Sequence, residues 1–265
     1  MSMFQASLPW KCILCDKYSL DTICKDCYNN NDNNNNNNNN NNFILIDENE
    51  YFLGKQKCIQ NYYECECNYY NHDDCCSNVC LNKYRQFECV SKSCQIEKQT
   101  NNSKLCNNRK FQRKQYKDVK VLCSGDTELG LFANEYIASN EFIIEYIGEI
   151  IDETECKRRL KDVYYFNNKF YIIQFKRDTS NNKRSVYSID ATQKGGKARY
   201  INHSCSPNCS AEQWTVGDEQ RIGIFALQNI QKGDELTFCY QYKQQQENAI
   251  KTKCLCGSSK CKGYI

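Results

Sequence analysis

The sequence predicts a mostly β domain flanked by small cysteine-rich regions that bind zinc. From about residue 118, short apolar runs rich in Val, Ile, Phe and Tyr recur between turn residues, as in proteins built from short strands. The chain has 21 cysteines among 265 residues, far above ordinary usage. No G-x-G-x-x-G turn follows a strand, which argues against a Rossmann-type nucleotide domain.

The length suits one sizeable domain with small satellites. No apolar run approaches the ~20 residues of a membrane helix. The first ten residues show no basic segment followed by an apolar one, so we expect no secretory signal and a reducing compartment. In such a compartment cysteines bind zinc more often than they form disulfides, and an odd number of cysteines cannot all pair.

The formal net charge of +3 treats every cysteine as neutral. Each zinc ion held by four thiolates adds a net charge of about −2, so the true balance is near neutral or slightly acidic. A general attraction to nucleic acid therefore does not follow, and only local basic patches could provide one.

The N-terminal residues divide into two parts. Residues 1–28 contain Cys12, Cys15, Cys24 and Cys27 in a C-x2-C-x8-C-x2-C pattern, which predicts a small zinc knuckle, with unmetallated cysteines as the alternative. Residues 29–57 include a long Asn tract, and a polar tract cannot bury enough apolar surface to offset its ordering entropy. We expect a disordered linker there.

Residues 58–113 form a second cysteine-rich region with little apolar periodicity, so metal must replace a missing hydrophobic core. Its candidate ligands are Cys65, Cys67, Cys76, Cys80, Cys89, Cys94 and Cys106. The basic stretch N-N-R-K-F-Q-R-K-Q-Y-K, residues 107–117, follows these cysteines. It is either a solvated face or a contact for phosphate or an acidic partner.

Residues 114–243 carry the strand signals. The expected strands are 117–123, 130–137, 141–151, 169–175, 185–191, 221–227 and 234–242. A short helix is expected near 152–165, and turns at Ser139–Asn140 and Lys232–Gly233. Many short strands with one or two helices indicate a mostly β domain.

Residues 244–265 contain Cys254, Cys256 and Cys261, one ligand short of a tetrahedral zinc site. The fourth must come from elsewhere. Residues 199–209, R-Y-I-N-H-S-C-S-P-N-C, hold one of the two histidines, one of the two prolines and Cys205. His203 and Cys205 could bind metal or belong to another site.

Taken together, R-Y-I-N-H-S-C-S-P-N-C, E-L-T-F-C-Y and the terminal C-x-C-x4-C resemble the SET-domain protein lysine methyltransferases. The cysteines of residues 58–113 resemble the AWS zinc region of one branch. N-N-R-K-F-Q-R-K-Q and I-D-A-T-Q-K-G are similar to the enzymes of that branch that methylate lysine 36 of histone H3. The resemblance covers about residues 60–265.

The resemblance implies a SET-domain β-fold in which N-H-S-C threads beneath E-L-T-F-C-Y in a pseudoknot, an exception to unknotted topology. It implies that Asn202 and His203 contact S-adenosylmethionine, with Gly130, Arg199 and Tyr200 shaping that site. It also implies that Cys205 joins Cys254, Cys256 and Cys261 on a structural zinc ion.

For the AWS-like region, seven thiolates on two zinc ions require one shared cysteine. By position, one ion would take Cys65, Cys67, Cys76 and Cys80, and the other Cys76, Cys89, Cys94 and Cys106. Cys75 could substitute for the shared Cys76. We therefore expect three zinc ions, or four if residues 1–28 bind one.

The resemblance assigns Tyr240 as the central catalytic residue, orienting the lysine amine. Phe238 lies where relatives carry Phe or Tyr, and Phe leaves room for di- or trimethylation. Tyr146, Phe170 and Tyr171 would line the lysine channel, although each could equally be a core residue.

Three features depart from the family pattern. Glu128 replaces the first Gly of a G-x-G turn, Cys239 stands where Asp or Asn is common, and the loop 177–185 is long. Residues 241–253 are a hypothetical gate over the lysine channel.

The predicted function is methylation of histone H3 lysine 36 in nucleosomes, with the H3 tail as partner. Nucleosomal DNA would be contacted through Arg109, Lys110, Arg113 and Lys114. We expect a monomer acting in the nucleus on chromosomes, without membrane contact. The alternatives are a degenerate SET domain that binds chromatin without catalysis, or a methyltransferase for another lysine.

Overall fold

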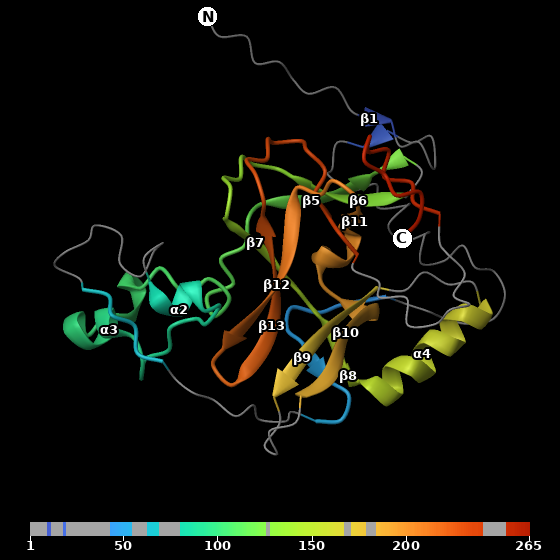
Figure 1. Ribbon diagram of the computed structural model, residues 1–265. Coiled ribbons are helices and arrows are strands. Elements are labelled where there is room, and N and C mark those ends of the chain that lie inside the picture. Colours follow the sequence, from blue (N-terminus) through green and yellow to red (C-terminus); the bar gives the residue numbers. More distant parts are fainter. Residues whose placement is uncertain are drawn as a thin grey trace, which may run out of the picture.

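The computed structural model describes residues 43–54, 63–68, 80–125, 128–166, 171–178, 184–240 and 253–265, together with a strand pair near the N-terminus (Figure 1). That pair is β1 (Trp10–Lys11) and β2 (Tyr18–Ser19), which run antiparallel. The predicted zinc knuckle of Cys12, Cys15, Cys24 and Cys27 lies outside the described residues, and its metal binding stays a prediction.

The predicted mostly β domain is confirmed, and its strands form two main sheets. The first sheet has the order β3-β10-β8-β4, with β9 also paired to β10. Its strands are β3 (Ile44–Leu45), β4 (Glu50–Tyr51), β8 (Gly148–Asp152), β9 (Ile172–Asp178) and β10 (Arg184–Gly195).

The second sheet has the order β11-β14-β12-β13-β7. Its strands are β7 (Phe142–Tyr146), β11 (Asn202–His203), β12 (Cys209–Val216), β13 (Glu219–Ala226) and β14 (Thr237–Phe238). A separate hairpin pairs β5 (Val119–Cys123) with β6 (Leu129–Ala133). The apolar faces of these strands pack into one core around fully buried residues such as Leu131, Ile189 and Ile224.

The run 141–151, predicted as one strand, divides at Ile147 into two strands of different sheets. The second strand begins at Gly148, which lies tight against β10, where a Cβ would come within 2.6 Å of the Asp190 carbonyl oxygen. A continuous apolar run is therefore shared between the two sheets.

β12 was not predicted from the sequence, and it pairs with β13 along its whole length. Its residues, C-S-A-E-Q-W-T-V, are largely polar, and only Cys209, Trp214 and Val216 are buried. The apolar alternation that predicts a strand is therefore incomplete.

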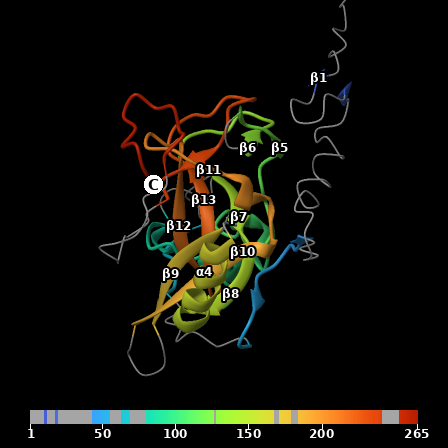
Figure 2. The ribbon, with the colours of Figure 1, turned by 90° about the vertical axis from the view of Figure 1, so that its right-hand side faces the viewer.

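The predicted helix is present as α4 (Glu153–Phe166), which packs against β8 and β10 (Figure 2). Arg159 ties the helix to the sheet, since its Nη1 lies 2.9 Å from Glu149 and 2.8 Å from Asp190. No helix in the part of the chain that the structure describes is long and apolar enough to cross a membrane.

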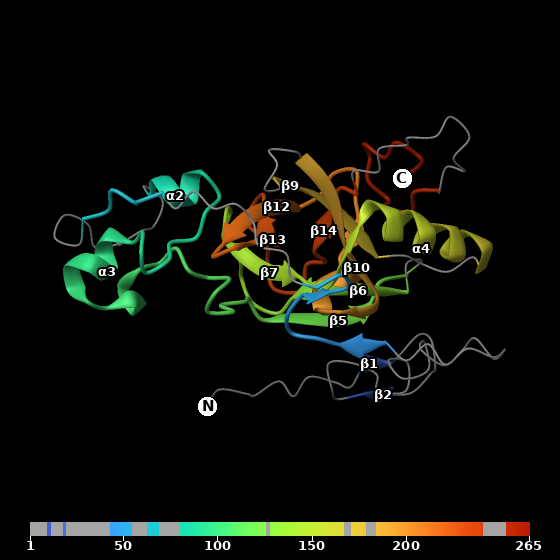
Figure 3. The same ribbon diagram turned by 90° about the horizontal axis from the view of Figure 1, so that it is seen from below.

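The AWS-like region lies at the opposite end of the molecule from α4 (Figure 3). It contains α2 (Leu81–Tyr84), α3 (Gln95–Thr100) and the 3-10 helix η2 (Ser103–Leu105). Its interior consists mainly of buried cysteines and Ile96, in agreement with the expectation that metal replaces a core.

The AWS-like region is joined firmly to the second sheet. Backbone bonds run from Glu88 N to Thr215 O and from Thr215 N to Gln86 O, extending the edge of β12. The buried Glu88 carboxylate accepts the backbone N–H groups of Phe111 (2.7 Å) and Gln112 (3.1 Å). Phe111 then packs in an aromatic cluster with Phe142, Trp214 and Phe225.

The prediction of a disordered linker over 29–57 is wrong for residues 43–54. These residues form β3, parallel to β10, and β4, parallel to β8. We name residues 43–54 the strap. The composition of the Asn tract dominated the prediction, whereas F-I-L-I and Y-F-L supply the apolar and β-branched residues that suit strands.

Candidate active site and metal sites

The candidate active site lies where β11 and β14 run side by side. β11 pairs in parallel with β14, in the register Asn202 with Thr237 and His203 with Phe238. The backbone N–H of Ser204 donates to the carbonyl of Phe238 at 3.1 Å. The fold thus brings N-H-S-C and E-L-T-F-C-Y together, although their first residues, Asn202 and Glu235, are 33 positions apart in the chain.

Two hydrogen bonds hold Tyr240, one from its side-chain hydroxyl and one from its backbone N–H. Its hydroxyl donates to the carbonyl of Ile201 at 2.6 Å, and its backbone N–H donates to Nδ1 of His203 at 3.0 Å. Because Nδ1 accepts, the neutral imidazole carries its proton on Nε2. Nε2 lies 3.4 Å from Sγ of Cys205, to which it can donate.

Tyr146 and Tyr171 lie close to Tyr240. Burial raises the pKa of Tyr146 well above its usual value, and neighbouring Tyr240 raises it further. Burial likewise raises the pKa of Tyr240, with Tyr171 adding to the effect. Both hydroxyls therefore remain protonated at physiological pH. Phe238 is buried with its ring centroid 4.8 Å from that of Tyr240, whereas Phe170 lies outside the described residues.

Arg199 and Tyr200 lie in the 3-10 helix η4 (Lys197–Tyr200), which leads into β11. Both are buried. The guanidinium donates to the carbonyls of Ala191 (2.9 Å) and Thr192 (3.3 Å) and to the hydroxyl of Tyr200 (3.2 Å). Arg199 therefore fixes η4 against β10.

Asn202 is held by a carboxylate that sequence analysis did not single out. Its amide nitrogen donates to Oε1 of Glu235 at 2.7 Å and to the carbonyl of Leu129 at 3.0 Å. Ser124 Oγ donates to the other oxygen of Glu235 at 2.7 Å. Glu235 is the first residue of the E-L-T-F-C-Y motif, and its role follows from contacts with residues far away in the chain.

Gly130, on β6, adjoins this cluster. A Cβ at Gly130 would come within 2.4 Å of Oε1 of Glu235, so the position has no space for a side chain. Glu128, in place of the first Gly of the family turn, has φ +68°. It thus adopts the left-handed conformation that Gly favours, at a cost of about 1 kcal/mol.

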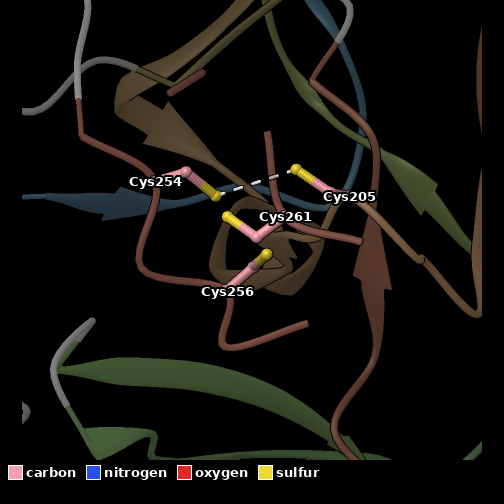
Figure 4. Close-up of side chains that lie close together, drawn as sticks. All are labelled: Cys205, Cys254, Cys256 and Cys261. Carbon is pink, nitrogen blue, oxygen red and sulfur yellow. Dashed lines mark hydrogen bonds between the residues drawn. The ribbon is translucent and has the colours of Figure 1, made fainter. Parts of the chain in front are cut away.

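The C-terminal cysteines and Cys205 form the clearest candidate metal site (Figure 4). The sulfurs of Cys205, Cys254, Cys256 and Cys261 all lie within 4.8 Å of one another. Backbone N–H groups point at two of them, from Lys262 to Cys205 (3.4 Å) and from Gly263 to Cys261 (3.3 Å). Four converging sulfurs with N–H donors suit thiolates on a tetrahedral zinc ion.

The AWS-like cysteines form two further groups among the described residues. One contains Cys65, Cys89 and Cys94, and the other Cys65, Cys67 and Cys80. Cys65 therefore has the position of a shared ligand, a place that the sequence analysis gave to Cys76. Cys76 and Cys75 lie outside the described residues, and Cys106 is buried in the same interior without joining either group.

Two buried asparagines, which sequence analysis missed, line this interior. Asn82 donates to Sγ of Cys89 at 3.6 Å, and Asn108 donates to the same sulfur at 3.5 Å. The backbone N–H of Gln95 donates to Sγ of Cys65 at 3.3 Å. Such donors suit thiolates that also bind a metal.

The predicted DNA contact through four basic residues is not supported by the positions of three of them. Arg109 is buried and forms an ion pair with Glu97. Arg113 donates to the carbonyl of Ser103, and Lys114 forms ion pairs with Asp47 (3.1 Å) and Glu48 (3.0 Å) of the strap. These three side chains face acidic and backbone groups of their own chain.

Comparison with known proteins agrees with this geometry. Residues 128–241 match the family model described as SET domain. The chain is 38% identical over 236 residues to human histone-lysine N-methyltransferase SETD2, covering 84% of this chain and 8% of that protein. It is 37% identical over 210 residues to the histone-lysine N-methyltransferase, H3 lysine-36 specific, of Mycosarcoma maydis, covering 77% of this chain and 20% of the relative.

A relative of Debaryomyces hansenii with the same description is 40% identical over 185 residues, covering 69% of this chain and 23% of the relative. The chain therefore contains a SET domain and belongs to the SET-domain family of histone-lysine methyltransferases. Within that family it resembles the branch whose members are described as H3 lysine-36 specific. It spans less than a quarter of the length of each of these relatives.

Proposed function

We propose that this protein transfers a methyl group from S-adenosylmethionine to lysine 36 of histone H3. The observation that carries the proposal is the junction of β11 and β14, which joins Asn202 and His203 to Phe238 and Tyr240 within one hydrogen-bonded unit. The similarity to relatives described as H3 lysine-36 specific supports the substrate.

The cofactor would be held by the groups around η4, β6 and β11. Asn202 offers an amide oriented by Glu235, and Gly130 brings backbone close to that carboxylate. His203 offers a neutral ring, and Arg199 and Tyr200 support the chain leading to it. These neutral polar and aromatic groups suit a nucleoside with an amino-acid tail. When bound, S-adenosylmethionine supplies an activated methyl group on a sulfonium.

The amine that accepts the methyl group must be neutral, although free lysine has a pKa near ~10.4. Tyr146, Tyr171 and Phe238 would provide apolar ring surface that removes water from the ammonium and lowers its pKa. The Tyr240 hydroxyl already donates to Ile201, so its oxygen is oriented to accept a hydrogen bond from the amine. Such orientation supplies much of the acceleration.

The number of methyl groups that the lysine can receive depends on the space beside Tyr240. Phe238 has no hydroxyl with which to hold a water beside the amine, and this supports di- or trimethylation. Phe170 would complete the channel and lies outside the described residues, as does the hypothetical gate 241–253 apart from Lys253. These two roles stay predictions.

Zinc would have a structural role, held by the four C-terminal cysteines and by the AWS-like cysteines. We propose three ions, with a fourth if Cys12, Cys15, Cys24 and Cys27 bind one. The histone H3 tail in the nucleosome would be the partner, and the nucleus the place of action. Glu128 and Cys239, which depart from the family pattern, would favour a degenerate SET domain. Glu128 preserves a Gly-like φ, however, and Cys239 is exposed.

The test is methyl transfer from labelled S-adenosylmethionine to two kinds of recombinant nucleosome. One carries unmodified histone H3, and the matched control carries arginine in place of lysine 36. We expect label only on the first, with di- or trimethyl lysine in its mass spectrum. Equal labelling of both would contradict the substrate, and no labelling by zinc-loaded, folded protein would contradict the activity.

A further inference from the structure

The strap, residues 43–54, is bound to both main sheets. Its β3 pairs with β10, and the Ile46 N–H donates to the carbonyl of Gly195 at 3.1 Å. Asn49 accepts the Gly148 N–H at 3.0 Å and donates to Glu145 at 3.3 Å. Because these bonds involve β7, β8 and β10, the strap crosses the boundary between the sheets.

Phe43, the first residue of the strap, packs against the guanidinium of Arg199. The ring of Phe43 lies under the Arg199 guanidinium, 4.1 Å from its centroid to Cζ. The ring of Tyr171 lies 3.9 Å from the same atom. Phe43 also contacts Tyr200 edge-to-face, with 6.5 Å between ring centroids.

The rings of Phe43 and Tyr171 stabilise the buried positive charge of Arg199. Arg199 is 9% exposed, and among the described residues no carboxylate lies within ion-pair distance of its guanidinium. Its hydrogen bonds go to carbonyls and a tyrosine hydroxyl. A buried cation without a counter-ion is costly, and an aromatic face offsets part of that cost, most strongly away from water.

The guanidinium of Arg199 is linked both to the proposed lysine channel and to the segment proposed to hold the cofactor. Tyr171, one of the proposed channel residues, donates its N–H to Thr192 Oγ1 and accepts the Ala191 N–H at 2.8 Å. Ala191 and Thr192 are the residues whose carbonyls bind Arg199. On the other side, η4 continues directly into Asn202 and His203.

We propose that Phe43 is a positioning residue for methyl transfer: its ring and that of Tyr171 hold the Arg199 guanidinium, and through it the channel wall and the start of β11. The inference rests on the proposed methyltransferase function. The strap is accordingly a part of the catalytic unit, although it precedes the AWS-like region in the chain.

The test compares Phe43→Leu, Phe43→Tyr and Phe43→Trp in the zinc-loaded chain. Leucine keeps an apolar side chain but removes the π face, whereas tyrosine and tryptophan keep it. We expect Phe43→Leu to lower kcat/KM on nucleosomes about tenfold, and at least one aromatic variant to stay within about threefold of wild type. Leu53→Ala is the control, since Leu53 is an exposed residue of the same strap.

A second readout does not require activity. Hydrogen exchange followed by mass spectrometry should show faster exchange of the amides of residues 197–203 in Phe43→Leu, restored by the aromatic variants. Unchanged kinetics and exchange in Phe43→Leu would overturn the inference, and so would equal losses in all three variants. If wild type binds no S-adenosylmethionine and transfers no methyl group, the proposed function fails, whereas exchange still reports on the Phe43 contact.

Discussion

The backbone N–H of Tyr240 donates to Nδ1 of His203, and this bond links the candidate catalytic residue to the candidate metal site. It fixes the proton on Nε2, which points at Cys205 Sγ. Cys205 in turn belongs to the C-terminal group of four sulfurs. The position of Tyr240 therefore depends on a site formed by residues from two distant segments.

Loss of C-terminal zinc should disable catalysis without unfolding the main domain. We expect Cys256→Ser to lower the zinc content by about one ion per chain and to reduce methyl transfer at least about 100-fold. Cys239→Ser, at an exposed cysteine outside the group, is the matched control and should change neither. Full activity in Cys256→Ser with reduced zinc would contradict the link to Tyr240.

Glu235 should control cofactor affinity through Asn202. In Glu235→Gln, one carboxylate oxygen becomes an NH2 group, which accepts no hydrogen bond. The side chain then loses one of the two hydrogen bonds that it accepts from Asn202 and Ser124. We expect the dissociation constant for S-adenosylmethionine to rise about tenfold or more, measured by calorimetry. Ser124→Ala should cause a smaller rise, because Glu235 keeps its bond to Asn202. An unchanged constant in Glu235→Gln would show that Asn202 is oriented by other groups.

The buried Glu145 should make stability depend on pH. Burial raises the pKa of Glu145 to about 7, opposed by the charge of Arg221 and by a hydrogen bond from Tyr116, while Glu219 and Glu88 raise it further. In the unfolded chain the pKa lies near 4.5. The folded state therefore binds the proton more tightly, and stability falls as the pH rises from about 4.5 to about 7.

The glutamine variant isolates this effect. Relative to Glu145→Gln, the wild type should lose on the order of 2 kcal/mol of unfolding free energy between pH 5 and pH 7.5. Denaturant titration across that range measures the difference. A difference between the two proteins that stays constant with pH would mean that Glu145 is charged throughout.

The basic stretch should matter for folding more than for DNA contact. Arg109→Ala leaves the carboxylate of Glu97 without its ion-pair partner, and we expect a loss of about 3 kcal/mol of stability. Lys110→Ala, at a half-buried neighbour, should lie within about 0.5 kcal/mol of wild type. Thermal unfolding of both variants compares them, and equal stabilities would contradict the structural role of Arg109.

The sequence predicted the helix and most of the longer strands, because runs of apolar and β-branched residues are local signals, although the expected strand 234–242 shortens to β14. Spacing grouped Cys254, Cys256 and Cys261, whereas only the family resemblance added Cys205 to them. β12 was missed because its mixed polar residues are set by pairing with β13 rather than by periodicity. The strap was hidden by the Asn tract before it. Glu235, Asn82 and Asn108 gained their roles only from contacts between residues far apart in the chain.

The central claim is that the junction of β11 and β14 is a methyl-transfer site organised around Tyr240. The most direct measurement is single-turnover transfer to nucleosomes by wild type and Tyr240→Phe, with S-adenosylmethionine affinity measured on the same samples. We predict a rate at least about 100-fold lower in Tyr240→Phe, with cofactor affinity nearly unchanged. Equal rates in the two proteins would contradict the claim.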